Sequence, residues 1–438
     1  MKKIYFNELK EYVGKEVEFA GFVDNIRNLQ WVQFVIVRDS LGKVQVTIEK
    51  SEEKNKEMVD LISTLPLEST VVVRGMLVEN PKVKLNGMEI IPTSIEVTST
   101  SNLELPFTFK DLNTVNLDTR LDYRFIDLRN EKNMGIFQIQ SKVVQYLREY
   151  LYNNGFTEIH TPKLIGAASE SGSEVFEVKY FNDKAYLAQS PQFYKQMAMA
   201  SGFGRIFEVA PCFRAENSNT NKHATEFTSF DVEFSYIESF DDVMNLEAEM
   251  IAYAFKKVNE EMGEKLKTLY DIELTVPTLP FPKMALKDIY DELETRYGYK
   301  VDDKEKNDLT TEAERLCKKL AKDKFNHEFL FVTDFPAEKR AFYHMRKEGV
   351  LQGYDLIWNG IEITTGAQRE HRYEEIVKNA NEKGLANDVK FYLEFFKYGC
   401  PPHGGFAIGV DRLTMLLLNI PTVKETQFLF RGPNRINP

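Results

Sequence analysis

The hydrophobic pattern changes its period once along this chain, and that change limits the folds open to it. Over the first hundred residues, apolar and polar residues alternate in short runs, as in Lys43-Val-Gln-Val-Thr-Ile-Glu49. A period of two is typical of half-buried strands. From about residue 134 the apolar residues recur with helical spacing, and further strand-like runs follow. The sequence therefore predicts a small all-β unit followed by a larger α+β unit.

The first unit has the order of elements expected of a five-stranded OB barrel. Three strand-like runs, a polar segment with helical spacing and two more strand-like runs follow one another. They cover residues 17–23, 33–38, 43–49, 52–63, 70–78 and 88–97. Another small barrel is the alternative. We assign residues 1–102 to this OB domain and residues 103–128, which show no clear period at their start, to a hinge or linker.

Residues 129–438 are predicted to form one α+β domain. A long amphipathic helix over 134–152 ends at Asn153-Asn-Gly155, which is typical of a helix C-terminus. Strands are expected at 184–188, 205–213, 226–236, 353–365 and 404–410, and helices at about 240–262 and 411–418. Because the regular rhythm of parallel sheets is missing, we expect an antiparallel sheet flanked by helices. The mixed segment at about 265–345 is interpreted as an insertion.

Composition argues against several other classes of protein. The chain has 438 residues, 43% of them hydrophobic and 28% charged, which is typical of a globular protein with a sizeable core. No apolar run reaches the roughly 18–20 residues of a membrane-spanning helix, and no signal peptide is recognisable. The widely spaced Cys212, Cys317 and Cys400 argue against disulfides or a zinc cluster. We expect a cytoplasmic protein that does not bind a membrane. Its net charge of -11 argues against attraction of the whole protein to nucleic acid, so an RNA-binding face would have to be local.

Two stretches of the second unit carry most of the chemistry. The first reads Phe213-Arg-Ala-Glu-Asn-Ser-Asn-Thr-Asn-Lys-His-Ala-Thr-Glu-Phe-Thr-Ser-Phe-Asp-Val-Glu233. As a hairpin it would offer a cation for a phosphate, a carboxylate for an exocyclic amine and an aromatic face for a base. The second, Gly404-Gly-Phe-Ala-Ile-Gly-Val-Asp-Arg-Leu413, joins a glycine-rich strand to an arginine at a helix start, where a nucleotide can approach the backbone. Taken alone, each is more often a surface hairpin or a packing feature.

Together these stretches resemble motifs 2 and 3 of the class II aminoacyl-tRNA synthetases. The helix at 134–152 with Phe156-Thr-Glu-Ile-His-Thr-Pro-Lys163 resembles motif 1, and the motifs follow in the family's order. Within the class, the chain is most similar to aspartyl-tRNA synthetases of the archaeal and eukaryotic type over nearly its full length. Segments that carry this likeness include Gln189-Ser-Pro-Gln-Phe-Tyr-Lys-Gln196 and Gly366-Ala-Gln-Arg-Glu-His-Arg372. The resemblance implies activation of L-aspartate with ATP, its transfer to tRNA-Asp, and a homodimer through the motif 1 helix and the strand around Pro162.

The resemblance also implies where ATP binds. Arg214 and Arg412 are the expected catalytic residues, because they match the arginines that contact the α- and γ-phosphates. Catalysis would consist of positioning and charge stabilisation during attack by the substrate carboxylate on the α-phosphorus. The expected ATP-binding residues are Arg214, Glu216, His223, Phe227, Glu362, Gly409 and Arg412. Mg²⁺ is the expected cofactor, with Glu362 and Thr365 as its ligands and Asp355 close by.

The other two substrates are placed in the same way. A buried β-carboxylate needs fixed cations, and Lys195 and Arg369 match the family residues in that role. The expected aspartate-binding residues are Glu170, Ser190, Gln192, Lys195, Asp231, Thr365 and Arg369. In the OB domain, the residues that match anticodon contacts are Arg27, Phe34 and Gln45. Phe34 would stack on the central anticodon uridine and Gln45 would hydrogen-bond to it.

Other functions remain as alternatives. Asn217-Ser-Asn-Thr220 and Lys339-Arg-Ala-Phe-Tyr343 are closer to asparaginyl-tRNA synthetases. Against that reading, a neutral amide would leave the charges of Lys195 and Arg369 poorly compensated. A non-enzymatic RNA-binding paralogue is disfavoured because the predicted catalytic arginines are both present. The sequence leaves open whether tRNA-Asn is charged as well as tRNA-Asp.

Overall fold

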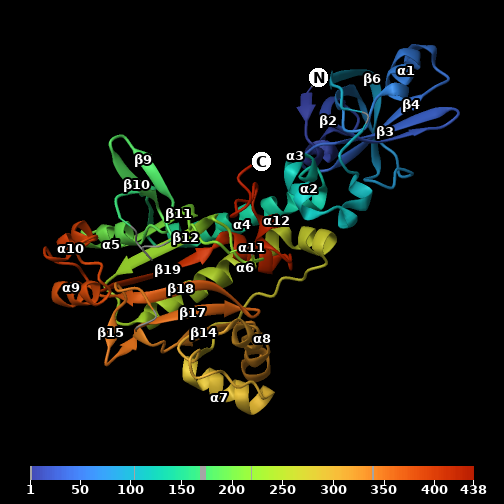
Figure 1. The fold of residues 1–438 in the computed structure, drawn as a ribbon. Helices are drawn as coiled ribbons and strands as arrows, with labels where there is room; N and C mark the ends of the chain where they lie inside the picture. The colour runs from blue at the N-terminus through green and yellow to red at the C-terminus, as the bar shows by residue number, and fades with distance from the viewer. Residues whose placement is uncertain (1, 103, 168–173, 219, 338–339) are drawn as a thin grey trace. The chain divides into compact units, whose positions relative to one another are not determined.

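The computed structural model describes residues 2–102, 104–167, 174–218, 220–337 and 340–438 (Figure 1). It divides the chain into two compact units, Met1–Asn113 (unit 1) and Thr114–Pro438 (unit 2). The division falls inside the segment that was predicted as a linker. Among the described residues, no helix is long and apolar enough to cross a membrane. The three cysteines are free, and Cys212 and Cys317 are buried.

Unit 1 is the predicted OB barrel. Its elements are β1 (Lys2–Ile4), η1 (Phe6–Tyr12), β2 (Glu16–Asn28), β3 (Val32–Arg38), β4 (Lys43–Glu49), η2 (Glu53–Asn55), α1 (Lys56–Thr64), β5 (Thr70–Glu79) and β6 (Met88–Ser99). The strands run in the order β1-β2-β3-β4-β6-β5, and β2 also pairs with β5. Every second residue of β4, Val44, Val46 and Ile48, is fully buried in the barrel, as the alternation predicts. Strand β2 continues past its predicted end because a register shift between Val23 and Asn25 absorbs the break in alternation.

Unit 2 is built on a sheet with the strand order β13-β14-β17-β18-β19-β12-β11-β7. Its strands are β7 (Thr157–Glu158), β11 (Arg205–Phe213), β12 (Glu226–Ser235), β13 (Lys283–Ala285), β14 (Phe329–Thr333), β17 (Gly353–Trp358), β18 (Ile361–Arg369) and β19 (His403–Gly409). The inner pairs are antiparallel, whereas the edge pairs β7–β11 and β13–β14 are parallel. Shorter strands form two small sheets: β8 (Leu164–Ile165), β9 (Glu177–Tyr180), β10 (Asp183–Leu187), β15 (Arg346–Lys347) and β16 (Val350–Leu351). The predicted antiparallel sheet is therefore confirmed.

Helices flank this sheet (Figure 1). The helices of unit 2 are α2 (Leu117–Asp122), α3 (Arg124–Asp127), α4 (Glu131–Asn153), α5 (Gln192–Ala200), α6 (Phe240–Tyr270), α7 (Leu286–Tyr297), α8 (Thr311–Phe325), α9 (Tyr373–Glu382), α10 (Lys390–Phe396), α11 (Val410–Leu417) and α12 (Val423–Thr426). A short 3-10 helix, η3 (Phe109–Thr114), spans the division between the units in the sequence. Helices α4 and α6 pack together against the sheet in one core cluster, which includes Leu147, Phe255 and Phe406. Helix α4 begins earlier than predicted because the Asn130 side chain caps it by accepting from the Lys132 and Asn133 amides.

Two predictions for residues 265–365 need correction. The single strand expected at 353–365 is wrong, because β17 and β18 form a hairpin. Its turn is Asn359-Gly360, where both residues have positive φ angles, 50° and 82°. Asn-Gly is a strong signal for such a turn, and here it interrupts a run of apolar residues. The segment at about 265–345 also contributes β13 and β14 to the main sheet, so it is not wholly an insertion beside it.

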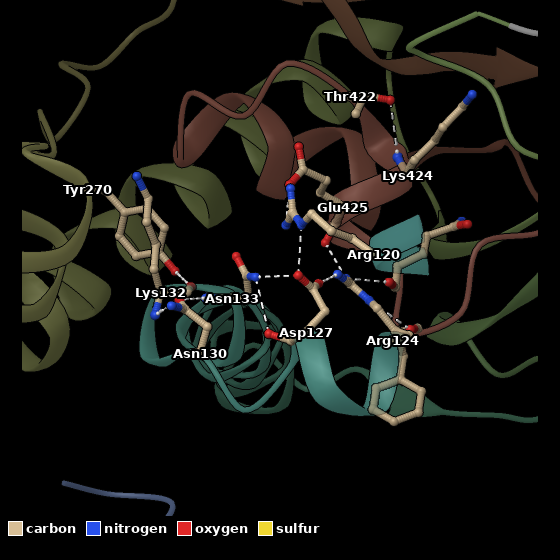
Figure 2. A network of polar contacts seen from close by, with 12 residues as sticks. Arg120, Arg124, Asp127, Asn130, Lys132, Asn133, Tyr270, Thr422, Lys424 and Glu425 are labelled. Carbon is tan, nitrogen blue, oxygen red and sulfur yellow. Dashed lines mark hydrogen bonds and ion pairs between the residues drawn. The ribbon is translucent and has the colours of Figure 1, made fainter. Parts of the chain in front are cut away.

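A buried polar network joins α2 and α3 to the C-terminal segment (Figure 2). The guanidinium of Arg124, 2% exposed, donates to the carbonyl oxygens of Glu425, Gln427 and Phe428 at 2.8, 3.1 and 3.2 Å. It also pairs with Asp127, which accepts from Arg120 Nε at 2.7 Å. A buried arginine without partners would be costly. The network therefore fixes residues 425–428, which lie next to the site described below.

Glu247 on α6 makes the stability of the fold depend on pH. Tyr354 Oη donates to Glu247 Oε2 at 2.7 Å, and burial raises the pKa of Glu247 from 4.5 to about 8. Between those two pH values the folded protein holds a proton that the unfolded chain has lost, so stability falls as the pH rises through this window. We expect Glu247→Gln to lose less stability than the wild type between about pH 5.5 and about pH 8.5. Melting temperatures of both proteins at both pH values would check this, and equal losses would contradict it.

Candidate active site

A cavity of about 280 Å³ lies against β12, β18, β19 and the start of α11. Every residue predicted to bind ATP lines it. These residues are Arg214, Glu216, His223, Phe227, Glu362, Gly409 and Arg412. They come from segments almost two hundred residues apart, and the antiparallel sheet brings them together.

The hairpin of β11 and β12 forms one wall of the cavity. Its strands pair without interruption from Arg205 opposite Phe234 to Phe213 opposite Glu226, and the Arg214 amide adds a hydrogen bond to Thr225 O at 2.9 Å. The Arg214 guanidinium carbon lies 5.3 Å from the Phe227 ring centroid. Its Nε is buried and has no acceptor among the described residues. Arg214, which is predicted to bind a phosphate, therefore lies next to Phe227, which is predicted to stack on a base. The Nε–H of Arg214 is available as a donor.

Arg412 and His223 also line the cavity. Arg412 Nη1 donates to Glu362 O at 2.7 Å, which holds its guanidinium across β18. Burial, together with the charge of Arg412, places the pKa of His223 below its usual value. His223 is therefore neutral near pH 7, and Arg412 supplies the positive charge. A Cβ added at Gly409 would make only an ordinary van der Waals contact, 3.7 Å from Arg412 Cβ, so the backbone at this glycine is not crowded.

Oxygen atoms converge beside Glu362. Thr365 Oγ1 donates to Asp355 Oδ1 at 2.9 Å and lies 3.1 Å from Glu362 Oε1. Burial and the nearby charge of Glu362 raise the pKa of Asp355 to about 7, against the opposing charge of Arg340. The parts of the chain that the structure describes hold no cluster of three or more His, Cys, Asp or Glu side chains suited to a metal. The site offers two carboxylates and a hydroxyl instead. These groups suit a cation such as Mg²⁺, which takes its other oxygen ligands from phosphate and water.

The pocket predicted for aspartate continues along the same strands. Asp231 on β12 lies opposite Ala407 on β19, which lies opposite Thr365 on β18. Residues directly opposite one another project from the same face of a sheet. Ser229, two residues before Asp231, lines the ATP cavity. At about 3.3 Å per residue, the predicted amino-acid pocket therefore begins roughly 7 Å further along β12.

Four buried charges lie together where the pocket for aspartate is predicted. Lys195 Nζ on α5 lies 2.9 Å from Asp231 Oδ1 and 3.4 Å from Glu233 Oε2. Arg369 Nε on β18 donates to Glu233 Oε1 at 3.0 Å, and its Nη2 donates to Gly405 O at 2.9 Å. The exposed fractions of Lys195, Asp231, Glu233 and Arg369 are 0%, 2%, 0% and 3%. Burial favours the neutral acid, but the charges of Arg369 and Lys195 outweigh it and lower the pKa of Glu233.

Glu233 is the pocket residue to which the sequence pattern gave no role. A signal existed, because Asp231 and Glu233 are two residues apart on one strand and share a face. Glu233 also corrects the argument that a neutral substrate would leave Lys195 and Arg369 poorly compensated. Asp231 and Glu233 already balance these two positive charges before any substrate binds. Lys195 Nζ nevertheless has no acceptor in good hydrogen-bond geometry among the described residues. The pocket thus contains a buried ammonium with donors to spare.

The other predicted aspartate-binding residues lie around these charges. Ser190 precedes α5, and its Oγ accepts from the Gln192 amide at 3.3 Å. The Gln192 side chain donates to Gln196 Oε1 at 3.1 Å, and Gln196 lies 3.0 Å from His403 Nε2. Burial lowers the pKa of His403 to about 4, so its neutral ring donates from Nδ1 to Pro401 O and accepts from Gln196 at Nε2. Glu170 lies outside the described residues.

The residues predicted to contact an anticodon share one face of unit 1. Arg27 on β2 lies opposite Phe34 on β3, and Phe34 lies opposite Thr47 on β4. Gln45 lies two residues along β4 from Thr47, on the same face. Gln45 Nε2 donates to Glu89 Oε2 at 3.0 Å, which fixes its amide. The structure therefore brings Arg27, Phe34 and Gln45 together.

Family models match both units of the chain. Residues 116–431 match the model described as tRNA synthetases class II (D, K and N), and residues 17–98 match the model described as OB-fold nucleic acid binding domain. The chain belongs to the class II tRNA synthetases of the D, K and N group.

Relatives and solved structures agree with this family over the full length. The chain is 42% identical to the aspartate–tRNA(Asp) ligase of Pyrococcus furiosus over 99% of each chain. It is also 42% identical to the aspartate–tRNA(Asp/Asn) ligase of Methanopyrus kandleri, over 97% of this chain and 96% of that protein. A solved asparaginyl-tRNA synthetase of Pyrococcus horikoshii, complexed with asparaginyl-adenylate, shares the fold with a TM-score of 0.89 at 28% identity, covering 100% of this chain and 99% of that one. The fold is therefore common to ligases for both amino acids.

Proposed function

We propose that this chain is an aspartate–tRNA ligase, which converts L-aspartate and ATP into aspartyl-adenylate and diphosphate and then transfers the aspartyl group to tRNA-Asp with release of AMP. The observation that carries this proposal is that the buried Lys195 and Arg369 lie beside strands that line the ATP cavity: Arg369 is on β18, and Lys195 pairs with Asp231 on β12. An adenylate needs its nucleotide and its amino acid side by side in this order. The full-length identity to ligases named for aspartate supports the same choice.

The first step needs positioning rather than a side-chain nucleophile. An oxygen of the substrate α-carboxylate attacks the α-phosphorus in line, the bond to the bridging oxygen breaks, and diphosphate leaves. Arg214 is proposed to stabilise the charge that develops on the α-phosphate, and Arg412, with His223, to hold the γ-phosphate. Phe227 would stack on the adenine and Glu216 would accept from its amino group, while Gly409 leaves room for the nucleotide at the backbone.

We propose Mg²⁺ as the cation of this site, held by Glu362 and Thr365, with Asp355 behind them. When bound, it would neutralise phosphate charge. Asp355 already receives an ion pair from Arg340 at 2.5 Å and a hydrogen bond from Thr365. Its role is therefore proposed to be the orientation of Thr365 towards the cation.

The contacts of the pocket favour aspartate over asparagine. A carboxylate offers acceptors to both Lys195 and Arg369, whereas an amide offers one oxygen and turns its own N–H donors towards a donor. The ammonium of the substrate is proposed to lie at Asp231 and Glu170, and Ser190, Gln192 and Thr365 complete the pocket. Because the asparaginyl fold is so similar, this local difference in donors and acceptors decides the proposal.

The tRNA is proposed to bind unit 1 through Arg27, Phe34 and Gln45, with its anticodon bases splayed out of the stack. We also propose a homodimer through α4 and the segment around Pro162, which lies between β7 and β8 and is not the strand that was predicted there. Phe137, Val144 and Tyr152 of α4 line a hollow there together with Val209. Tyr152 is 52% exposed, and Phe428, whose ring lies 6.0 Å from that of Phe137, is 64% exposed. Apolar side chains left in water on one face favour burial against a second copy.

The proposal is tested by measuring which amino acid and which tRNA the protein uses. We expect diphosphate exchange into ATP with L-aspartate and at least about 100-fold less with L-asparagine, because one lost charged contact costs about 3 kcal/mol. Charging of tRNA-Asp and tRNA-Asn transcripts with each amino acid would then show the tRNA range. Preferential exchange with asparagine would overturn the proposal, and no exchange with either would favour the non-enzymatic alternative.

A further inference from the structure

Strand β18 carries an extra residue where it borders the ATP cavity. Leu356 on β17 lies opposite Thr364. The next residue of β17, Ile357, lies opposite Glu362, which leaves Ile363 over as a β-bulge. Pairing of β18 with β19 begins at Thr364, beyond the bulge. Because a bulge disrupts the ladder locally, the strands hold the backbone at Glu362 less firmly than the rest of β18.

Glu314 on α8 supplies a contact at this point. The Glu362 amide donates to Glu314 Oε1 at 2.5 Å, and Lys222 Nζ donates to Glu314 Oε2 at 3.0 Å. Lys222 lies on the segment between β11 and β12, and both Lys222 and Glu362 line the ATP cavity. Glu314 does not line it, and its side chain is 15% exposed. Its carboxylate therefore lies behind the wall of the cavity and contacts two residues of that wall.

Helix α8 gives this carboxylate a firm support (Figure 1). Cys317 and Leu320 of α8 are fully buried in one cluster with Ile357 of β17. The turn of the β17–β18 hairpin also rests on the helix. A Cβ added at Gly360 would come 3.0 Å from Arg315 O and 3.2 Å from Arg315 Cα. The hairpin and the first turns of α8 are therefore packed directly against each other.

The contacts of Glu362 show what this support can position. Its carbonyl oxygen accepts from Arg412 Nη1 at 2.7 Å, and its Oε1 lies 3.1 Å from Thr365 Oγ1. A change in the backbone at Glu362 would move both groups. A partly exposed ion pair such as that of Lys222 and Glu314 adds little to stability. Positioning of the site therefore explains the arrangement better than stability of the fold.

We propose that Glu314 is a positioning residue of the ATP site: from α8 it holds the bulge of β18, so that Glu362 presents its carboxylate to Mg²⁺ and its carbonyl oxygen to Arg412. Lys222 in turn holds the carboxylate of Glu314. This inference rests on the proposed function, because ATP and Mg²⁺ are the ligands of the site. It gives a helix of the segment that was interpreted as an insertion a part in the chemistry.

Two variants that remove the same charge test this role. Glu314→Gln keeps an oxygen that can accept from the Glu362 amide, whereas Glu314→Ala removes it. ATP affinity is measured by calorimetry on the full chain, once with Mg²⁺ and once with EDTA, and the ratio gives the gain due to Mg²⁺. In Glu314→Ala this gain is expected to fall by about 10-fold, as after the loss of one hydrogen bond to a charged group. Glu314→Gln should keep most of it.

The same titrations in EDTA separate positioning from charge. Without Mg²⁺, neither variant should bind ATP more weakly than the wild type, because a negative charge near the phosphates has been removed. Glu312→Ala, at a 45% exposed side chain of the same helix, is the matched control and should behave as the wild type does. Equal losses of the Mg²⁺-dependent gain in Glu314→Gln and Glu314→Ala would overturn the proposal, as would an unchanged gain in both.

Glu314→Asp keeps the proposal testable if the alanine variant fails to fold. It retains the charge, but its carboxylate is one methylene shorter and reaches less far towards the Glu362 amide. We expect a smaller Mg²⁺-dependent gain than in Glu314→Gln, and the reverse order would contradict the proposed role. A wild type that binds ATP without any such gain would overturn this inference and leave ATP activation standing. A wild type that does not bind ATP would overturn the proposed function itself.

Discussion

Replacing Lys195 with methionine is expected to lower aspartate activation by several orders of magnitude while ATP binding survives. Lys195 Nζ is fully buried, lies 2.9 Å from Asp231 and has donors to spare towards the pocket. Removal of one partner of a buried charge pair costs about 3–5 kcal/mol. Because a factor of ten corresponds to about 1.4 kcal/mol, kcat/KM for aspartate should fall by about 10²- to 10⁴-fold in diphosphate exchange. ATP affinity, measured by calorimetry, should change little, since Lys195 does not line the ATP cavity.

A second variant separates the loss of a substrate contact from the loss of stability. Lys195→Met leaves Asp231 and Glu233 with Arg369 as their remaining charge partner in the cluster, so some destabilisation is expected. Combining it with Glu233→Gln removes one charge of each sign and should restore part of the melting temperature without restoring aspartate activation. Lys378→Met, at a side chain that is 65% exposed, serves as the control. Recovery of activity in the double variant would show that Lys195 acts through the fold alone.

The elements with a strong local period could be predicted from the sequence. Alternation in Lys43–Glu49 places Val44, Val46 and Ile48 in the barrel interior, and each of them is fully buried. Helix α4 has its apolar residues on one side and its C-terminus at Asn153. In these segments burial and local propensity favour the same conformation, so that conformation can be predicted from one sequence alone.

Other features depend on contacts between distant parts of the chain, which no local pattern shows. Arg124 binds the carbonyl oxygens of residues about three hundred positions away, and its sequence neighbours give no hint of them. Glu233 became part of the site only when β12 paired with β19 and brought Arg369 next to it. The hairpin at Asn359-Gly360 was missed for another reason. Its turn residues were visible, but the buried strands on both sides read as one apolar run.

The order of groups along β12 separates two kinds of prediction. Phe227 and Ser229 line the ATP cavity, and Asp231 and Glu233 contact the buried cations. A change at the first pair should therefore affect nucleotide chemistry, and a change at the second pair should affect the amino acid. Arg214, which lies over Phe227, belongs to the nucleotide end.

Replacing Arg214 with alanine is accordingly expected to slow adenylate formation without weakening aspartate binding. Its guanidinium presents a buried Nε with no acceptor among the described residues, next to the ring of Phe227. Loss of one fixed donor to the charge that develops in a transition state typically lowers kcat by about 10²- to 10³-fold. Pre-steady-state formation of the adenylate should show this loss, with an aspartate dependence close to that of the wild type. Arg296→Ala, on the surface of α7, is the matched control.

The conservative variant decides what Arg214 contributes. Lysine keeps the charge but presents a point charge instead of a planar fork, so Arg214→Lys should recover only part of the rate if geometry matters as well as charge. Full recovery would mean that charge alone is sufficient. A rise in KM for ATP with an unchanged kcat would mean that Arg214 binds the ground state and the transition state equally, and would refute its proposed catalytic role. Lys195→Met and Arg214→Ala should therefore have opposite effects. Loss of Lys195 should impair the use of aspartate and leave ATP binding unchanged, whereas loss of Arg214 should impair the chemistry at ATP and leave aspartate binding unchanged.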